Sequence, residues 1–506
     1  MMLNNDGWER RVTLKDVARA IDGKLSGADD ANIIVVSDVT HDSREARAGS
    51  LFVAIRGAKF DAHSFVSQVL AQGALGIISE SARPADFAGV WIEVADARVA
   101  LALAAAEVQG HPSRKLRLVG ITGTNGKTTT AHLLAAICEA AGERVAVLGT
   151  VGYRIGEEQF KAEHTTPEAS AIQRFLRRAV EARCTVAVME TSSQALDLRR
   201  CDALHYRVAV FTNLTQDHLD YHGTMEVYYQ AKRRLFDGRL GSHPSLSVLN
   251  LDDIYGVRLA GELKESGARV ITYAIDAEAD VMARAIEYTL EGTRFALQTT
   301  TLELPVRSPL VGRPHIYNLL AATVCGIALG YDLEVMVRAF ETCAGAPGRF
   351  ERVGHAAGDF AVVVDYAHTD DALRNVLRTA RDVVTNGGRV ITVFGCGGDR
   401  DRTKRAPMGE AAAGLSDIVI LTSDNPRTED PEAILADTEV GLLRVIDKPY
   451  LKIAERREAI FRAIAEARDG DVVVIAGKGH EDYQIIGTET IHFDDKEVAR
   501  EALAAR

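Results

Sequence analysis

The stretch "GITGTNGKTTT" at residues 120–130 combines glycines, one lysine and several threonine hydroxyls. The overlapping run "KLRLVGIT" (115–122) predicts a buried strand, and "TAHLLAAICEAAGE" (130–143) predicts an amphipathic helix. A glycine-rich turn between a strand and a helix points backbone N–H groups and a helix N-terminus at an anion. In such a turn Lys127 would reach the outer phosphates of a nucleotide, and the Thr128 hydroxyl would bind Mg²⁺.

The match to the common phosphate-loop pattern is incomplete. That pattern places a glycine five residues before Gly126, but Ile121 stands there, and glycines occur at Gly120 and Gly123 instead. The alternative is a glycine-rich turn that only caps a helix. We favour a phosphate loop, because a glycine, lysine and threonine in succession between a strand and a helix are rarely structural filler.

Length and composition limit the possible classes of protein. The 506 residues predict about three domains, and 47% hydrophobic with 26% charged residues is ordinary for a globular protein. The formal net charge of −12 argues against a general role at nucleic acids or membrane surfaces. Six scattered cysteines without a C-x-x-C pair predict neither a zinc site nor a disulfide framework, and suggest a reducing cytoplasm. The N-terminal "MMLNNDGWER" lacks the apolar core of a signal peptide, and no apolar run could span a bilayer, so we expect a cytoplasmic protein.

Apolar, β-rich runs alternate with helical stretches in three groups, which predicts an α/β protein with parallel sheets. The first group includes "IIVVSDVTHDSR" (33–44), the second surrounds the glycine-rich turn, and the third begins at "FAVVVDYAH" (360–368). Junctions fall at "QGHPSRK" (109–115) and "CAGAPGRFERV" (343–353). We therefore predict domains at 1–111, 112–344 and 345–506.

Polar clusters follow several of these predicted strands directly. They are Glu190, Asn213, Asp365, 395–400, 424–427 and 477–481. Ligands of open parallel sheets bind beyond the carboxyl ends of the strands, so we expect a working face in two domains, which would face each other if the domains close. Glu190 is well placed to hold Mg²⁺, although it could instead cap a helix or form a salt bridge. The density of Asp217, His218, Asp220 and His222 favours a metal over histidines that merely pack.

The motifs "GTNGKTTT", "METSSQAL", "FTNLTQDHLDYHG", "PGRFE" and "DYAH" resemble those of the Mur ligases, which build the peptide of the cell-wall precursor in the cytoplasm. With "THDSR" (40–44), "HTTP" (164–167), "DNPR" (424–427) and "GKGHEDYQ" (477–484), the chain resembles the members that add meso-diaminopimelate to UDP-N-acetylmuramoyl-L-alanyl-D-glutamate. The resemblance spans nearly the whole chain, in order. It implies an N-terminal UDP-sugar-binding α/β domain, a central parallel-sheet phosphate-loop ATPase domain and a C-terminal Rossmann-like domain that binds the amino acid.

The resemblance also implies an ATP-dependent route through an acyl phosphate, with Lys127, Glu190, His218 and Lys232 in catalysis. It implies ATP contacts at Thr122, Gly123, Thr124, Asn125, Gly126, Lys127, Thr128, Asn318, Arg349 and Asp365. Its implied ligands of Mg²⁺ are Thr128, Glu190, His218 and Lys232, the last as a carbamate formed with CO₂. A carbamate would turn a cation that repels the metal into an anion that binds it. Without the resemblance, Lys232 would be an ordinary surface lysine.

The two substrates would be small molecules held far apart along the chain. The resemblance places the UDP-sugar dipeptide at Ser43, Thr165, Thr166, Ser192 and Arg200, with "GAKF" (57–60) beside it. It places diaminopimelate at Arg400, Asp424, Asn425, Pro426, Arg427, Gly477 and Glu481. Arg427 could bind the distal carboxylate of that amino acid bidentately, which lysine does not carry. By spacing alone, Thr166 could cap a helix and "DNPR" could be a simple turn.

Some residues depart from the family pattern. His315, Leu198, His164 and Asp370 replace the asparagine, glutamine, asparagine and proline that are usual there. His315 affects the expected adenine contacts, and Leu198 and His164 affect the expected dipeptide contacts. One alternative function is a relative with the same ATP chemistry and another acceptor, such as lysine addition or folylpolyglutamate synthesis. Another is a nucleotide-binding regulator without turnover. We expect no nucleic acid or membrane partner, and a monomer.

Overall fold

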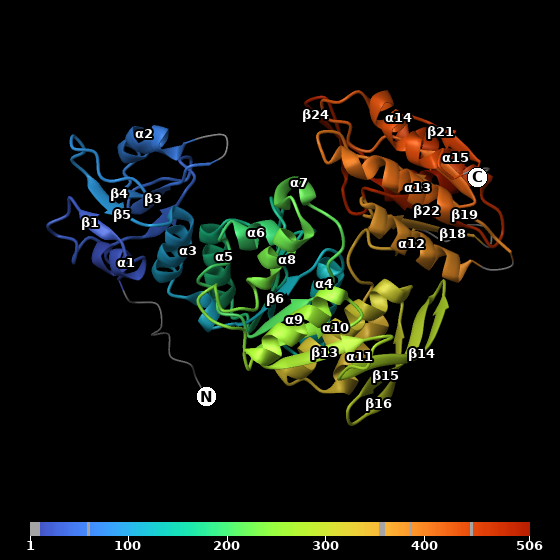
Figure 1. The fold of residues 1–506 in the computed structure, drawn as a ribbon, viewed down its shortest axis with the longest axis horizontal. Coiled ribbons are helices and arrows are strands. Elements are labelled where there is room, and N and C mark those ends of the chain that lie inside the picture. Colours follow the sequence, from blue (N-terminus) through green and yellow to red (C-terminus); the bar gives the residue numbers. More distant parts are fainter. Residues whose placement is uncertain (1–10, 58–60, 354–359, 385–386, 446–448) are drawn as a thin grey trace.

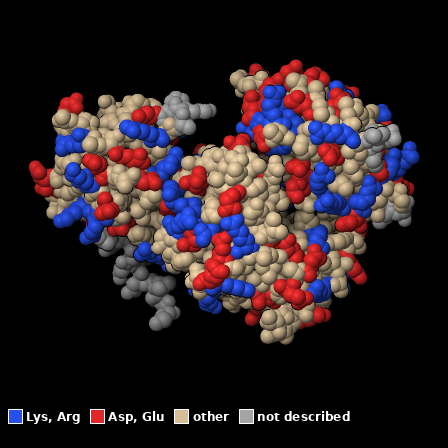
Figure 2. Space-filling view, in the orientation of Figure 1, with Lys and Arg blue, Asp and Glu red and all other residues tan. Residues whose placement is uncertain are grey.

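The computed structural model describes residues 11–57, 61–353, 360–384, 387–445 and 449–506. Three large β-sheets, each built from its own part of the chain, form three bodies, and the central body lies between the other two (Figure 1). The predicted α/β class is confirmed. Figure 2 shows that positive and negative side chains are interspersed over one face of the molecule. Within the described ranges, no helix is both long and apolar enough to cross a bilayer.

The N-terminal body is a five-stranded sheet in the order β1-β5-β4-β3-β2, parallel except for β1. Its strands are β1 (Lys24–Ser26), β2 (Asp38–Thr40), β3 (Ser50–Ala54), β4 (Gly76–Ser79) and β5 (Val90–Glu93). Its helices are α1 (Leu14–Ala20), α2 (Val66–Ala71) and α3 (Ala97–Val108). Asp38 lies buried in β2 and pairs with Arg47 at 2.7 Å and with Arg174 of the central body at 3.3 Å. This shared carboxylate helps to fix the two bodies against each other.

The central body is an eleven-stranded sheet in the order β16-β15-β14-β13-β12-β11-β6-β10-β7-β8-β9. Its strands are β6 (Arg117–Thr122), β7 (Val145–Leu148), β8 (Tyr153–Ile155), β9 (Glu158–Phe160), β10 (Val186–Glu190), β11 (Val208–Phe211), β12 (Leu246–Asn250), β13 (Val270–Ala274), β14 (Val281–Thr289), β15 (Gly292–Thr299) and β16 (Glu303–Ser308). The middle strands, from β14 to β7, pair in parallel. Antiparallel hairpins extend both edges, and β14–β16 form a projecting arm (Figure 1).

Helices cover both faces of the central sheet. They are α4 (Lys127–Ala140), α5 (Ala169–Glu181), α6 (Ser193–Asp197), α7 (Leu219–His222), α8 (Met225–Arg233), α9 (Ile254–Glu265), α10 (Arg313–Leu329) and α11 (Leu333–Thr342). Helix α10 is buried along most of its length and packs against α4. A helix that is apolar on all sides belongs in a core, and α10 thereby supports the helix that begins at Lys127.

The C-terminal body is a six-stranded sheet in the order β17-β18-β22-β19-β20-β21, parallel except for β17. Its strands, with a separate hairpin, are β17 (Glu351–Arg352), β18 (Ala361–Asp365), β19 (Val390–Phe394), β20 (Ile418–Leu421), β21 (Tyr450–Lys452), β22 (Val472–Ala476), β23 (Tyr483–Ile486) and β24 (Glu489–His492). Its helices are α12 (Asp370–Val383), α13 (Arg405–Leu415), α14 (Pro431–Leu442), α15 (Arg456–Glu466) and α16 (Asp495–Ala504). Its four inner strands are buried and helices cover both sides, so this is a doubly wound sheet.

Helix α12 lies where the C-terminal body meets the central one (Figure 1). Towards its C-terminal end it packs on the apolar residues Tyr288, Leu290 and Val311 of the central body. Gly312 has a φ of +97°, and a Cβ there would lie 2.3 Å from Cγ2 of Thr379 on α12. The side chain of Thr379 therefore packs directly on the backbone of Gly312, which leaves no room for a side chain at that position.

Candidate functional site: a phosphate loop facing a third domain

The glycine-rich turn joins β6 to α4, as the sequence predicts. Gly123 and Gly126 have φ of +151° and +87°, and a Cβ on Gly123 would lie 1.8 Å from Thr212 Oγ1. The Asn125 N–H donates to Asn213 Oδ1 at 2.9 Å, so the end of β11 supports the turn. Only glycine tolerates this geometry, which leaves the turn compact around the N-terminus of α4.

Two lysine ammonium groups share one acceptor in this turn. Lys127 Nζ donates to the carbonyl oxygens of Gly123 and Thr124, and Lys232 Nζ donates to Gly123 O, each at 2.9 Å. Lys232 is fully buried, with Nζ 4.5 Å from the centre of the Tyr228 ring. Burial, together with the charge of Lys127, lowers the pKa of Lys232 well below its usual value. Burial also lowers the pKa of Lys127, against the attraction of Glu190 and Asp217.

Oxygen donors converge at Glu190, which lies buried at the end of β10. Its Oε2 accepts hydrogen bonds from Thr128 Oγ1 and Thr150 Oγ1, both at 3.0 Å, and its Oε1 accepts from the Thr150 N–H at 2.8 Å. A Cβ on Gly149 would lie 2.4 Å from Oε1, so a side chain at position 149 would clash with the Glu190 carboxylate. A carboxylate and a threonine hydroxyl in contact beside a phosphate loop are hard oxygen ligands, which fit Mg²⁺.

The predicted cluster of histidines and aspartates divides into two environments. His218 lies before α7 with a φ of +53°, and its side chain is 43% exposed, with Nε2 3.4 Å from Asp217 Oδ2. His222 is buried, hydrogen-bonded to Ser193 Oγ at 2.9 Å and stacked on Tyr228. Burial lowers the pKa of His222 to about 4. In the part of the chain that the structure describes, no three His, Cys, Asp or Glu side chains form a metal cluster. The burial, hydrogen bond and ring stacking of His222 fit a packing role.

The remaining residues predicted to bind ATP come from α10 and the C-terminal body. Asn318 is buried beneath the phosphate loop, where its Oδ1 accepts from Thr130 Oγ1 at 3.3 Å. Arg349 places its guanidinium 4.4 Å from the centre of the Tyr366 ring, and its positive charge opposes protonation of Lys127. Asp365 accepts the N–H groups of Phe350 and Ala367 at 2.6 and 2.8 Å. These contacts fix the segment that carries Arg349.

The segment around Arg349 touches a second glycine-containing turn of the C-terminal body at the backbone. A Cβ on Gly348, whose φ is +67°, would lie 2.2 Å from the carbonyl carbon of Gly479 and from the nitrogen of His480. The Tyr366 N–H donates to Gly348 O at 2.9 Å. The predicted ATP contact at Arg349 and the predicted amino-acid contacts at 477–481 therefore lie on neighbouring turns.

The residues predicted for the dipeptide lie around Glu190, except for Ser43. Thr165 Oγ1 is 3.0 Å from Thr150 Oγ1, and Thr166 Oγ1 donates to the backbone oxygen of Glu190 at 2.8 Å. Arg200 donates to Thr166 O at 3.0 Å, and Ser192 Oγ caps α6 by accepting the Ala195 N–H. These four residues form one group on the central body.

Ser43 follows β2 in the N-terminal body, next to a cleft that reaches the central body. The cleft is lined by His41, Ile55, Gly57, Ala62, Phe65, Arg98 and Glu168. Glu168 pairs with Arg200 at 2.6 Å, which connects this cleft to the group around Glu190. Residues 58–60 of the predicted "GAKF" contact lie outside the described residues.

The residues predicted for the amino acid form a compact group in the C-terminal body. Asn425 Nδ2 donates to Glu481 Oε2 at 3.1 Å, and Gly477, with a φ of +120°, leaves room for Asp424. Arg427, with a φ of +53°, donates Nη1 to Gly398 O at 2.7 Å. A Cβ on Gly397 would lie 3.1 Å from that nitrogen and 3.8 Å from Cγ of Arg400. Pro426 lies buried between Asn425 and Arg427.

Sequence reasoning missed Lys478, which organises this group. Its buried Nζ lies 3.3 Å from Asp424 Oδ1 and donates to Asn425 Oδ1 and Tyr483 O at 2.9 and 2.7 Å. The bond to Oδ1 fixes which end of the Asn425 amide faces Glu481. Burial raises the pKa of Glu481, and the charge of Asp424 adds to that effect. A lysine within "GKGH" gives no such signal on its own.

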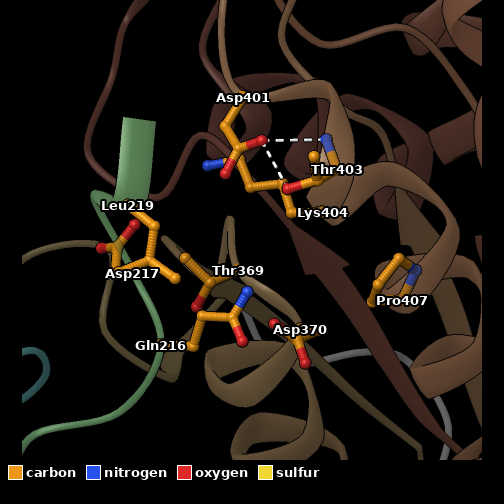
Figure 3. Close-up of a pocket in the computed structure, with 9 residues that line it drawn as sticks. All are labelled: Gln216, Asp217, Leu219, Thr369, Asp370, Asp401, Thr403, Lys404 and Pro407. Atoms are coloured by element: carbon orange, nitrogen blue, oxygen red, sulfur yellow. Dashed lines mark hydrogen bonds between the residues drawn. The ribbon is translucent and has the colours of Figure 1, made fainter. Parts of the chain in front are cut away.

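A cleft separates the central and C-terminal bodies beside the phosphate loop (Figure 3). It is lined by Gln216, Asp217, Leu219, Thr369, Asp370, Asp401, Thr403, Lys404 and Pro407. Figure 3 shows that the first three approach from the central body and the others from the C-terminal body. Polar residues of both bodies thus line one cleft, and the predicted domain closure stays a prediction.

Comparison with known proteins agrees with this arrangement. Residues 35–119 match the Mur ligase family catalytic domain, 121–326 the Mur ligase middle domain, and 348–479 the Mur ligase glutamate ligase domain. A relative from Solibacter usitatus is 48% identical over 92% of this chain and 93% of its own length. The chain belongs to the Mur ligase family. That relative, and one from Bacillus cereus that is 45% identical over 93% of this chain and 94% of its own, are UDP-N-acetylmuramoyl-L-alanyl-D-glutamate–2,6-diaminopimelate ligases.

A solved structure that bears the same enzyme name as these relatives is similar to this chain over nearly its whole length. It is 35% identical, covers 98% of this chain and 99% of its own, and superposes with a TM-score of 0.71. The predicted three-domain Mur ligase fold is confirmed. The limits 1–111, 112–344 and 345–506, and the roles of single residues, stay predictions.

Proposed function

We propose that this Mur ligase uses ATP to join meso-diaminopimelate to UDP-N-acetylmuramoyl-L-alanyl-D-glutamate in peptidoglycan precursor synthesis. The observation that carries the proposal is the Arg427 guanidinium. It is held by Gly398 O beside Arg400, in a chain 48% identical to a relative that bears this enzyme name. A fixed guanidinium suits a substrate with a second, distant carboxylate.

The chemistry requires activation of a carboxylate. One oxygen of the D-glutamyl carboxylate attacks the γ-phosphorus of ATP, the bond to the bridging oxygen breaks, and ADP leaves. The amine then attacks the acyl carbon of the acyl phosphate, phosphate leaves, and the nitrogen loses a proton. Phosphoryl transfer depends mainly on positioning and charge neutralisation. Lys127 would leave the carbonyl oxygens of Gly123 and Thr124 to hold the outer phosphates.

Mg²⁺ would be held by Thr128 and Glu190, whose oxygens already meet at 3.0 Å. When bound, Mg²⁺ neutralises phosphate charge and orients the phosphoryl group. We place His218 and a carbamate of Lys232 at a second ion. Carbamate formation needs a neutral amine, and the lowered pKa of the buried Lys232 favours that form. The carbamate would also remove the repulsion between the ammonium groups of Lys232 and Lys127.

The substrates would enter from opposite sides of the phosphate loop. The uridine diphosphate would lie near Ser43, and Thr165, Thr166, Ser192 and Arg200 would hold the dipeptide next to Glu190. The amino acid would lie at Asp424, Asn425, Arg427 and Glu481 in the C-terminal body. Asn318, Arg349 and Asp365 would contact the nucleotide, and approach of the C-terminal body would exclude water from the acyl phosphate.

The test is a phosphate-release assay with ATP, Mg²⁺ and the dipeptide precursor, in which the product is weighed by mass spectrometry. We expect rapid phosphate release and a product of the correct mass with meso-diaminopimelate, and slow reaction with lysine or glutamate. Faster reaction with lysine would favour the lysine-adding alternative. ATP binding without an amide product for any amino acid would favour a regulator without turnover.

A further inference from the structure

Asp371 forms a contact between the C-terminal body and the phosphate loop. It lies in the first turn of α12, and its Oδ2 accepts hydrogen bonds from Asn125 Nδ2 and Thr215 Oγ1, both at 3.0 Å. Asn375 on the same helix donates to the same oxygen at 3.3 Å. The two partners in the central body thus meet at one carboxylate oxygen.

Both partners are themselves part of the support of the loop. The Asn125 N–H donates to Asn213 Oδ1, and the Thr215 N–H donates to Thr124 Oγ1 at 3.0 Å. Thr124 Oγ1 in turn donates to Thr215 O at 3.1 Å. A movement of Asp371 would therefore act on the loop directly through Asn125 and indirectly through Thr215, which is hydrogen-bonded to Thr124.

Helix α12 connects this contact to the apolar contact at its other end. There Thr379 packs on Gly312, and the core of the C-terminal body extends to Tyr288, Leu290 and Val311. The apolar end needs no directional bond, whereas the Asp371 end depends on two hydrogen bonds with fixed geometry. If the C-terminal body rotated about the contact between Thr379 and Gly312, the distance from Asp371 to the loop would change more than the distances at that contact.

We propose that Asp371 is a positioning residue, which holds the phosphate loop in its nucleotide-binding form and makes that form depend on the position of α12. The proposal rests on the proposed function in one respect, the binding of a nucleotide at this loop. Asp371 touches the loop rather than the nucleotide. Burial raises the pKa of Asp371, against its hydrogen bonds to Thr215 and Asn125, which agrees with a carboxylate enclosed between two bodies.

The experiment compares Asp371→Ala, Asp371→Asn and Asp370→Asn in the full chain. Asp370 lies in the same first turn, lines the interface cleft, and has no hydrogen bond to the central body within the described part of the chain. Asp370→Asn therefore controls for the loss of a negative charge at the helix N-terminus. The readouts are hydrogen exchange of 121–127 without nucleotide, and calorimetric binding of ADP with Mg²⁺.

We expect Asp371→Ala to speed exchange of the loop and to weaken ADP binding about tenfold, the loss of two ordinary hydrogen bonds. Asp371→Asn keeps an acceptor oxygen, so we expect about a threefold loss, and Asp370→Asn should bind within about twofold of the wild type. Unchanged loop exchange in both Asp371 variants would overturn the proposal, as would an equal effect of Asp370→Asn. If the wild type bound no ADP, the proposed function would fail, whereas the exchange comparison would still decide the role of Asp371.

Discussion

Replacing Arg427 tests the specificity for diaminopimelate most directly. The Arg427→Ala variant removes a guanidinium whose Nη1 is bound to Gly398 O. Its other N–H groups have no hydrogen-bond partner within the described residues, so they are free to meet a carboxylate. A hydrogen bond to a charged group contributes about 1.5–3 kcal/mol, so losing a bidentate pair should cost at least about 3 kcal/mol. That corresponds to a loss of roughly 100-fold in kcat/KM for meso-diaminopimelate.

The assay measures phosphate release over a range of diaminopimelate concentrations, with ATP and the dipeptide precursor saturating. Lysine serves as a second amino acid, since it lacks the distal carboxylate and its low kcat/KM should not change. Arg427→Lys keeps a point charge but not the planar fork of the guanidinium. We expect its kcat/KM for meso-diaminopimelate to lie between those of the wild type and Arg427→Ala. Arg444→Ala, at an exposed arginine of the same body, is the matched control. The reasoning is refuted if Arg427→Ala retains wild-type kcat/KM for diaminopimelate, or if lysine loses as much.

Three further predictions concern the central body. Lys127→Ala should nearly abolish phosphate release in a folded protein, because it removes the ammonium group that would hold the outer phosphates; a normal rate would exclude the phosphate-loop assignment. Gly149→Ala should place a methyl group against Glu190 Oε1 and raise the Mg²⁺ concentration required for the half-maximal rate. Gly152→Ala, whose Cβ would have its nearest neighbour at 3.3 Å, should not change that concentration. Equal effects of the two variants would contradict the assignment of Glu190 to Mg²⁺. Burial lowers the pKa of His315 to about 4, so the unfolded chain takes up its proton first, and the stability falls by about 3 kcal/mol as pH drops from 6.5 to 4. Thermal melts of His315→Asn should show a weaker loss over that range, and identical pH profiles would contradict a buried neutral His315.

The parallel cores could be predicted from sequence because their strands are continuous apolar runs. The projecting arm β14–β16 was missed, since alternating charged and apolar residues on a half-exposed hairpin give no such run. Within the predicted stretch 33–44 the strand is short and lies at Asp38–Thr40, whereas the apolar run before it stays outside the strand, with Ile33 72% exposed. Arg47 and Arg174 compensate the buried Asp38, and a local pattern cannot show ion pairs between distant segments.

The candidate site divides in the same way. The phosphate loop, Glu190 and the 424–427 segment are visible because each is a short motif directly after a strand. Lys478 and Asp371 are not, because their importance lies in partners 53 and 246 residues away in the chain, Asn425 and Asn125. Only the folded arrangement of the two bodies brings these groups into hydrogen-bond distance.

The backbone contact between Gly348 and the Gly479–His480 peptide limits how this protein can change. Neither turn can gain a methyl group or an inserted residue unless the other turn changes its conformation as well. Single substitutions or insertions in either turn are therefore not tolerated. An amino-acid pocket grafted from a related enzyme should therefore include both turns from that enzyme. A chimera that exchanges only one should accumulate as insoluble or inactive material.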